Sequence, residues 1–122
     1  MPFPDRATAA AWLGGGVVGE AWAGGLEERD GGWWPRFDAD VLARLFEALV
    51  RAPSWPAWTA PALPVALLVA ERGILAPGAV AAMLAARPDA WSLGVPGAGH
   101  DVHLERPDAV AGFLDAFLTA HV

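Results

Sequence analysis

An unbroken apolar run, Leu-Pro-Val-Ala-Leu-Leu-Val-Ala, occupies residues 63–70. A strand with one face in water alternates apolar and polar residues, whereas a strand of a parallel sheet is apolar throughout because both of its faces are buried. Parallel neighbours also need a crossover of a dozen or more residues, usually a helix. Pro64 is tolerated because it stands at the beginning of the run. The run therefore predicts a parallel α/β arrangement.

The residues that follow supply the rest of this arrangement. Pro77 opens a predicted helix that ends at residues 87–89, and residues 91–95 are predicted to form a second short strand. Pro107 then begins a final helix whose apolar residues fall on one stripe: Val110, Phe113, Leu114, Phe117 and Leu118. Residues 61–122 are thus predicted to be one β-α-β-α domain with a right-handed crossover.

Residues 1–60 carry helical patterns, and we predict an all-helical segment there. Its clearest helix begins after Asp38 and carries an apolar stripe of Val41, Leu42, Leu45, Phe46 and Leu49. The chain has seven tryptophans, six of them in this first part, and four of these lie in two close groups: Trp33, Trp34, Trp55 and Trp58. These four predict an aromatic pocket for an apolar small molecule. The alternative is that they are packing residues.

A histidine stands on a glycine-flanked turn between the second strand and the last helix. His100 follows Gly97-Ala98-Gly99, and glycine lets a backbone bend with positive φ. Histidine is the side chain whose ordinary pKa lies closest to neutrality, so an imidazole on a fixed turn suits a general base. The alternative is a surface histidine without a chemical task.

In this order and spacing, these segments resemble the C-terminal half of an α/β-hydrolase. The likeness rests on residues 64–69, the turn through Pro77, residues 95–100 and the following Glu105-Arg106-Pro107. Residues 1–58 resemble the helical cap that family members insert before their last two strands, through residues 26–31 and 35–41. The resemblance implies that His100 is the catalytic base and that the cap is a wall of the substrate pocket.

The sequence departs from the family pattern at the nucleophile and the acid. The family nucleophile sits on a Gly-x-Ser-x-Gly elbow or an aspartate equivalent, and no stretch matches it. The two serines lie elsewhere, Ser54 in a proline–tryptophan loop and Ser92 inside a predicted strand. The acid that orients the histidine would fall on Gly73, so Glu71, the nearest carboxylate, is the candidate for that role.

Composition excludes several other classes of protein. A net charge of −6 with scattered arginines argues against nucleic acid as a partner. The chain has no cysteine and therefore no thiolate ligand for a metal. His121 lies a helix length away from the other two histidines, so we expect no metal site and no other cofactor. No apolar run is long enough to span a membrane, and the first residues do not form a secretory signal. We therefore expect a cytoplasmic protein.

Two parallel strands alone leave sheet edges and apolar faces open. We therefore expect another chain, the N-terminal half of a hydrolase with its nucleophile, or a homodimer, to complete the sheet. The predicted function is hydrolysis of an apolar small ester, lactone or epoxide. Two alternatives stay open: a non-catalytic remnant that binds a ligand or partner, and a repurposed acid–base enzyme (isomerase, lyase or cyclase) on a hydrophobic substrate. An ordinary hydrolase cut after its nucleophile half also stays open.

Overall fold

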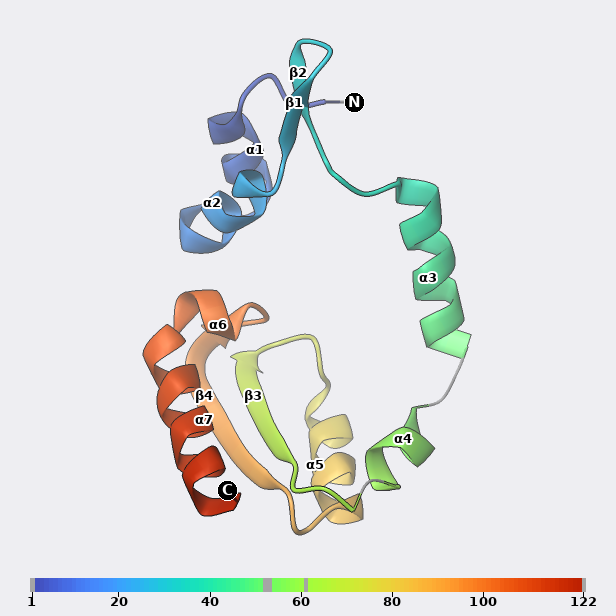
Figure 1. Cartoon of the computed structure of the whole chain (residues 1–122), viewed down its shortest axis with the longest axis vertical. Helices are drawn as coiled ribbons and strands as arrows, with labels where there is room; N and C mark the ends of the chain where they lie inside the picture. The colour runs from blue at the N-terminus through green and yellow to red at the C-terminus, as the bar shows by residue number, and fades with distance from the viewer. Residues whose placement is uncertain (1, 52–53, 61, 122) are drawn as a thin grey trace. The chain divides into compact units, whose positions relative to one another are not determined.

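The computed structural model describes residues 2–51, 54–60 and 62–121. It divides into two compact units, Met1–Pro53 and Ser54–Val122 (Figure 1). Trp55 and Trp58, which the sequence analysis assigned to the segment 1–60, lie in the second unit. The roles predicted for residues 1–60 and 61–122, as cap and catalytic core, stay predictions.

The first unit contains two short helices, a hairpin and a longer helix: α1 (Arg6–Trp12), α2 (Gly16–Gly24), β1 (Glu27–Arg29), β2 (Gly32–Trp34) and α3 (Ala39–Arg51). The prediction of an all-helical segment was therefore wrong. Asp30 and Gly31 both have positive φ, 51° and 74°, which is the backbone that a two-residue hairpin loop requires. Phe3 extends the hairpin through two backbone hydrogen bonds with Trp33, of 2.8 and 2.9 Å.

A small core holds the first unit together. Ala9, Ala23 and Leu26 are buried, and Phe3, Ala10, Leu13 and Trp33 pack around them. Helix α3 begins as predicted, because Oδ1 of Asp38 accepts hydrogen bonds from the backbone N–H groups of Asp40 and Val41. Its predicted apolar stripe is present, but none of the described residues of α3 is buried. This helix therefore contributes little to the core.

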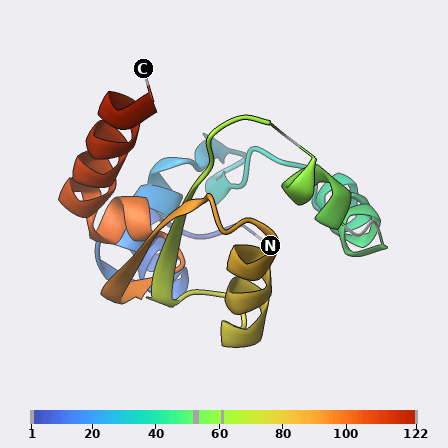
Figure 2. The ribbon, with the colours of Figure 1, turned by 90° about the horizontal axis from the view of Figure 1, so that it is seen from below.

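The second unit has the predicted β-α-β-α order. Its elements are α4 (Trp55–Thr59), β3 (Ala66–Arg72), α5 (Pro77–Ala86), β4 (Trp91–Gly99), α6 (Val102–Glu105) and α7 (Pro107–His121). Strands β3 and β4 pair in parallel, from Ala66 opposite Trp91 onward, so the α/β prediction is confirmed. The helices α5 and α7 flank the strand pair on opposite sides in both views (Figures 1 and 2).

Aromatic rings fasten α7 to the beginning of β4. The Trp91 ring meets those of Phe117 and His121 edge to face, at centroid distances of 5.9 and 5.3 Å. The Phe117 and His121 rings are themselves 4.5 Å apart. Such contacts contribute beyond the burial of apolar area. These ring contacts hold the C-terminal end of α7 against β4, the strand that precedes His100.

A buried arginine joins three segments of the second unit. The guanidinium of Arg87, only 6% exposed, donates to the carbonyl oxygens of Trp58 and Leu63 at 3.2 and 3.0 Å. It also makes two hydrogen bonds to the carboxylate of Asp89, of 3.0 and 2.8 Å. Arginine suits this place because its planar fork serves several acceptors at once. The pair connects α4, the approach to β3 and the approach to β4.

This pair makes acid stability depend on Asp89. The hydrogen bond from Arg87 holds the pKa of the Asp89 carboxyl below its ordinary value. The charged carboxylate therefore stabilises the folded state above the pKa of an unfolded aspartate, about 3.9, and this contribution is lost as the pH falls through the lower folded pKa. We expect Asp89→Asn to lower the thermal midpoint at pH 7 and to flatten its decline below about pH 4.

Circular dichroism melts between pH 7 and pH 2.5 measure both effects. Asp115→Asn is the control, since Asp115 is exposed on α7 and has no hydrogen bond or ion pair to another described residue. If the thermal midpoint of Asp89→Asn falls below about pH 4 as steeply as that of wild type, Asp89 is not the source of the acid sensitivity.

No helix of the described residues combines the length and apolar character that crossing a membrane would require.

Candidate active site

The predicted base lies at the carboxyl ends of the two parallel strands. His100 directly follows β4, and its side chain lines a cavity of about 290 Å³. The other residues described in its lining are Leu68, Val69, Ala70, Gly73, Ile74, Leu75 and Val102. In open α/β sheets, ligands bind beyond the carboxyl ends of the strands. His100 is thus a titratable group on the wall of an apolar cavity at such a place.

A bulge in β4 leads the chain into this position. The register pairs Ala70 with Val95 and then Arg72 with Gly99, so Glu71 alone stands opposite residues 96–98. Strand β4 is therefore longer than the predicted residues 91–95, because the extra residues bulge and pairing resumes beyond them. Bulges near active sites commonly redirect a side chain. Here the bulge precedes His100 by two residues.

The two glycines before His100 serve different purposes. Gly97 has a φ of +66°, a backbone conformation that side-chain-bearing residues rarely adopt and that glycine allows. At Gly99 the matter is space: a Cβ there would lie 2.5 Å from Oε1 of Glu105, so a larger residue would displace that carboxylate. The turn thus favours glycine at Gly97 for its torsion angle, and Gly99 leaves room for the Glu105 carboxylate.

Glu71 lies on β3, and its carboxylate bonds to the backbone of the segment that precedes His100. Its Oε2 accepts a hydrogen bond of 2.6 Å from the N–H of Gly97. Among the described residues, no hydrogen bond or ion pair joins His100 to a carboxylate. Gly73, where the family acid would fall, lines the same cavity as His100. The role of Glu71 as the orienting acid therefore stays a prediction.

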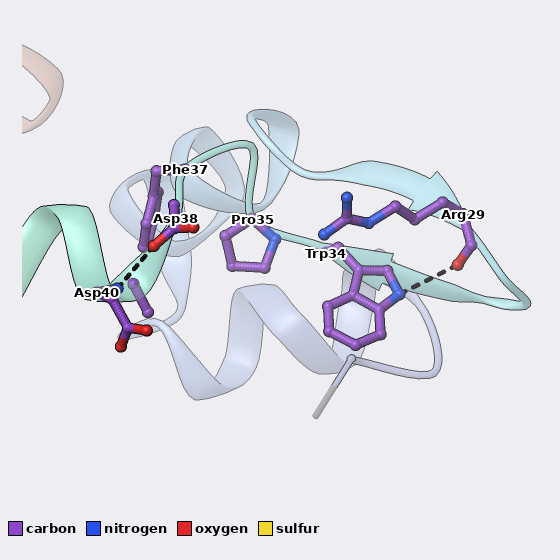
Figure 3. Close-up of a pocket in the computed structure, with 7 residues that line it drawn as sticks. Arg29, Trp34, Pro35, Phe37, Asp38 and Asp40 are labelled. Carbon is purple, nitrogen blue, oxygen red and sulfur yellow. Dashed lines mark hydrogen bonds between the residues drawn. The ribbon is translucent and has the colours of Figure 1, made fainter.

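Trp33 and Trp34 occupy different surroundings on strand β2. Trp33 packs on the core of the first unit, and the Arg6 guanidinium lies 4.2 Å from its ring centroid. Trp34 lines a pocket of about 410 Å³, with Pro35 and Phe37 on one side and Asp38 and Asp40 near α3 (Figure 3). Its Nε1 donates to the carbonyl oxygen of Arg29 at 3.1 Å. Trp33 is not among the described residues that line this pocket.

Trp55 and Trp58 line a smaller hollow in the second unit. It measures about 150 Å³ and also includes Ser54 and Met83. The Nε1 of Trp58 donates to the carbonyl oxygen of Met83 at 2.9 Å, which joins α4 to α5. The four predicted tryptophans are therefore distributed between the two units, and their shared role in substrate binding stays a prediction.

A different set of aromatic residues forms the apolar pocket of the first unit. This pocket, of about 490 Å³, is lined by Phe3, Trp12, Leu13, Trp22, Gly25, Leu26, Pro35, Arg36 and Phe37. Trp12 and Trp22 are 75% and 54% exposed. The sequence analysis missed them because an apolar helical position has the same pattern whether it faces a core or an open pocket.

The described residues include no cluster of three histidine, aspartate or glutamate side chains that could hold a metal ion. His121, the histidine farthest along the chain, packs on Phe117 and Trp91, and its Nδ1 lies 2.8 Å from the carbonyl oxygen of Phe117.

Comparisons with known proteins identify similar solved structures. No family model and no curated protein matches the sequence. The crystal structure of E-2-(acetamidomethylene)succinate hydrolase is similar with a TM-score of 0.83 and 27% identity, over 94% of this chain and 47% of that chain. The thioesterase domain from the curacin biosynthetic pathway is similar with a TM-score of 0.72 and 21% identity, over 93% of this chain and 45% of that domain's chain. The chain thus spans less than half the length of either structure.

Proposed function

Because the chain has the fold of the C-terminal part of an α/β-hydrolase, as its sequence predicted, we propose that it supplies the base and the substrate-binding surfaces of such an enzyme. The substrate is an apolar small ester, lactone or epoxide. The observation that carries the proposal is the place of His100, on the wall of an apolar cavity at the carboxyl ends of β3 and β4.

The chemistry assigned to His100 is proton transfer. For an ester, a hydroxyl nucleophile attacks the acyl carbon while the imidazole takes its proton, and the same proton then passes to the departing alcohol. Water afterwards attacks the acyl carbon while His100 takes one of its protons. His100 then returns this proton to the oxygen of the nucleophile as the acyl–oxygen bond breaks, which releases the acid and restores the hydroxyl. Glu71 is the proposed orienting acid, and its bond to Gly97 keeps its carboxylate on the same turn.

The nucleophile is proposed to come from outside residues 1–122. Ser54 lies at the N-terminus of the short helix α4, and Ser92 lies within β4, so neither occupies a strand-to-helix elbow. The companion is either a second chain that carries the N-terminal half of a hydrolase or a preceding segment of a longer chain. A homodimer that closes the sheet is the alternative arrangement.

Open edges and apolar surface favour a companion. Among the described residues, β3 pairs only with β4, so each strand has an unpaired edge. Large apolar side chains of the second unit are also exposed: Leu63, Ile74, Leu75, Leu114 and Leu118. Exposed edges and apolar patches mark surfaces that pair with other segments. The predicted cytoplasmic location, without nucleic-acid or membrane partners, belongs to the same proposal.

The apolar substrate is proposed from the lining of two pockets. The cavity at His100 and the aromatic pocket of the first unit both present mainly apolar side chains. Their volumes, about 290 and 490 Å³, suit a small molecule rather than a polymer. Trp33, Trp34, Trp55 and Trp58 remain the proposed substrate-contacting tryptophans, and the aromatic pocket adds Trp12 and Trp22.

Isolation of the native assembly tests the proposal. We expect the tagged chain to purify in a complex, or as part of a longer polypeptide, that hydrolyses p-nitrophenyl butyrate. If the nucleophile is a serine, a fluorophosphonate probe is expected to label it outside residues 1–122. If the nucleophile is an aspartate, a substrate epoxide is expected to trap it as a covalent ester. Native mass spectrometry identifies the companion. Purification of the chain from its native source as a stable monomer, with no companion chain and no longer polypeptide, contradicts the proposal.

The aromatic pocket of the first unit favours a second function, binding of an apolar molecule without turnover. This pocket contains no titratable group of the proposed mechanism, so binding there does not need His100. Titration with a naphthalene-based fluorophore distinguishes the two functions. Binding that survives His100→Ala, in a protein without hydrolytic, isomerase or lyase activity, favours the binding function over both enzymatic alternatives.

A further inference from the structure

We propose that Arg72 and Glu105 are positioning residues that hold the turn of His100 in its working geometry. This inference rests on the proposed function of His100. Arg72 ends β3, and Glu105 ends α6, so the two residues lie before and after the histidine turn in the chain. Together they bind the backbone on the approach to His100.

The bulge leaves backbone groups without their strand partners. Residues 96–98 stand opposite Glu71 alone, so the regular ladder cannot serve all their N–H and C=O groups. At Gly97, side chains of β3 provide the hydrogen bonds that the ladder does not. Its N–H donates to Oε2 of Glu71, and its carbonyl oxygen accepts a hydrogen bond of 2.5 Å from Nη2 of Arg72. Consecutive residues of β3 thus hold both polar groups of one residue in the bulge.

Glu105 holds the turn from the other direction. Its Oε1 accepts a hydrogen bond of 2.9 Å from the N–H of Gly99, the residue directly before His100. Its Oε2 lies 3.9 Å from Nη2 of Arg72. The carboxylate is 19% exposed, whereas the Arg72 side chain is 69% exposed. Glu105 therefore links Gly99, which precedes His100, to helix α6, which follows it.

The hydrogen bonds matter more than the ion pair. At 3.9 Å, with Arg72 mostly in water, the charge attraction is screened. The bonds from backbone N–H groups to carboxylates are charge-assisted and stronger than neutral ones. They also determine where the backbone of His100 lies, and a displacement of about 1 Å at a reacting group costs on the order of 10²-fold in rate.

Kinetics of Glu105 variants test the positioning role in the assembly that hydrolyses p-nitrophenyl butyrate. We expect Glu105→Ala to lower kcat about 10- to 100-fold with KM within about twofold, because the base is misplaced while the cavity is intact. Glu105→Gln keeps an oxygen acceptor for Gly99 and is expected to recover most of the activity. Asp115→Ala, an exposed carboxylate on α7, is the matched control and should behave as wild type.

Hydrogen exchange on the 122-residue chain provides a readout that does not depend on turnover. The amide of Gly99 is expected to exchange at least about tenfold faster in Glu105→Ala than in Glu105→Gln. The amide of Trp91, which donates to Val65 at the beginning of the sheet, should be unchanged and reports folding. If Glu105→Ala fails to fold, Arg72→Met replaces it, because that side chain is exposed, and a loss of kcat is expected there too.

The outcomes separate this inference from the proposed function. An inactive His100→Ala together with a fully active Glu105→Ala overturns the positioning role and leaves the function of His100 intact. Full activity in His100→Ala overturns the proposed function itself. An unchanged Gly99 exchange rate in Glu105→Ala overturns the positioning role in either case.

Discussion

Replacing His100 by alanine is expected to lower kcat/KM for p-nitrophenyl butyrate by about 10³-fold in the native assembly, because general base catalysis contributes about 10² to 10⁴-fold. The imidazole lines the cavity at the ends of β3 and β4, and no other histidine of the described residues does so. Loss of the base removes both proton transfers of the proposed reaction. The cavity itself keeps its apolar lining, so KM is expected to change much less than kcat.

His103→Ala is the matched control for this experiment. His103 lies three residues further on, in the short helix α6, and its side chain is exposed. It does not line the cavity of His100. We expect the activity of this variant to lie within about twofold of wild type, as for other surface substitutions. Equal losses in His100→Ala and His103→Ala would mean that the turn matters structurally and that His100 is not the base.

The largest effect on stability is expected from Gly19→Ala in the first unit. Gly19 is buried in α2, and a Cβ there would collide with the backbone carbonyl oxygen of Ala10 in α1. A backbone oxygen cannot rotate away, so α1 and α2 must separate and expose the small core around Ala9 and Ala23. We expect a loss of about 2–3 kcal/mol in the free energy of unfolding, which is the usual size of an overpacking penalty.

Gly24→Ala is the matched glycine control in the same helix. No atom lies within 4 Å of the Cβ that it would add. Alanine lowers the entropy of the unfolded chain relative to glycine, so a change of between zero and about 1 kcal/mol in favour of the folded state is expected. Urea unfolding followed by tryptophan fluorescence compares the variants. If Gly19→Ala unfolds at the same urea concentration as wild type, the close helix packing is wrong.

The hairpin of the first unit shows where sequence patterns were insufficient. Strands β1 and β2 have three residues each, which is too short for an alternating pattern to be recognised. Its signal was the pair Asp30-Gly31, which favours a two-residue hairpin loop. That pair lies inside the segment 1–60 that was predicted to be all-helical. The pairing of Phe3 with Trp33, thirty positions along the chain, had no local signal at all.

The glycine turn before His100 shows the same limits on a smaller scale. The sequence indicated that its glycines permit positive φ, and Gly97 adopts it. The bulge that surrounds it was not foreseen, because register depends on which residues of β3 stand opposite β4. Glu71 was chosen from the sequence as the carboxylate nearest to Gly73, where the family acid would fall, whereas its hydrogen bond to Gly97 became known only from the folded chain.

By itself, the sequence determined the local elements: the apolar strand β3, the crossover α5, the stripe of α7 and the glycine turn before His100. These follow from periodicity and torsional preference, which act over a few neighbouring residues. Only the tertiary structure decided which polar groups meet. Glu71 and Gly97 are 26 positions apart, Arg72 and Gly97 are 25 apart, and Arg87 and Leu63 are 24 apart. Such contacts depend on strand register and on the space left between packed elements, and local patterns carry no information on either.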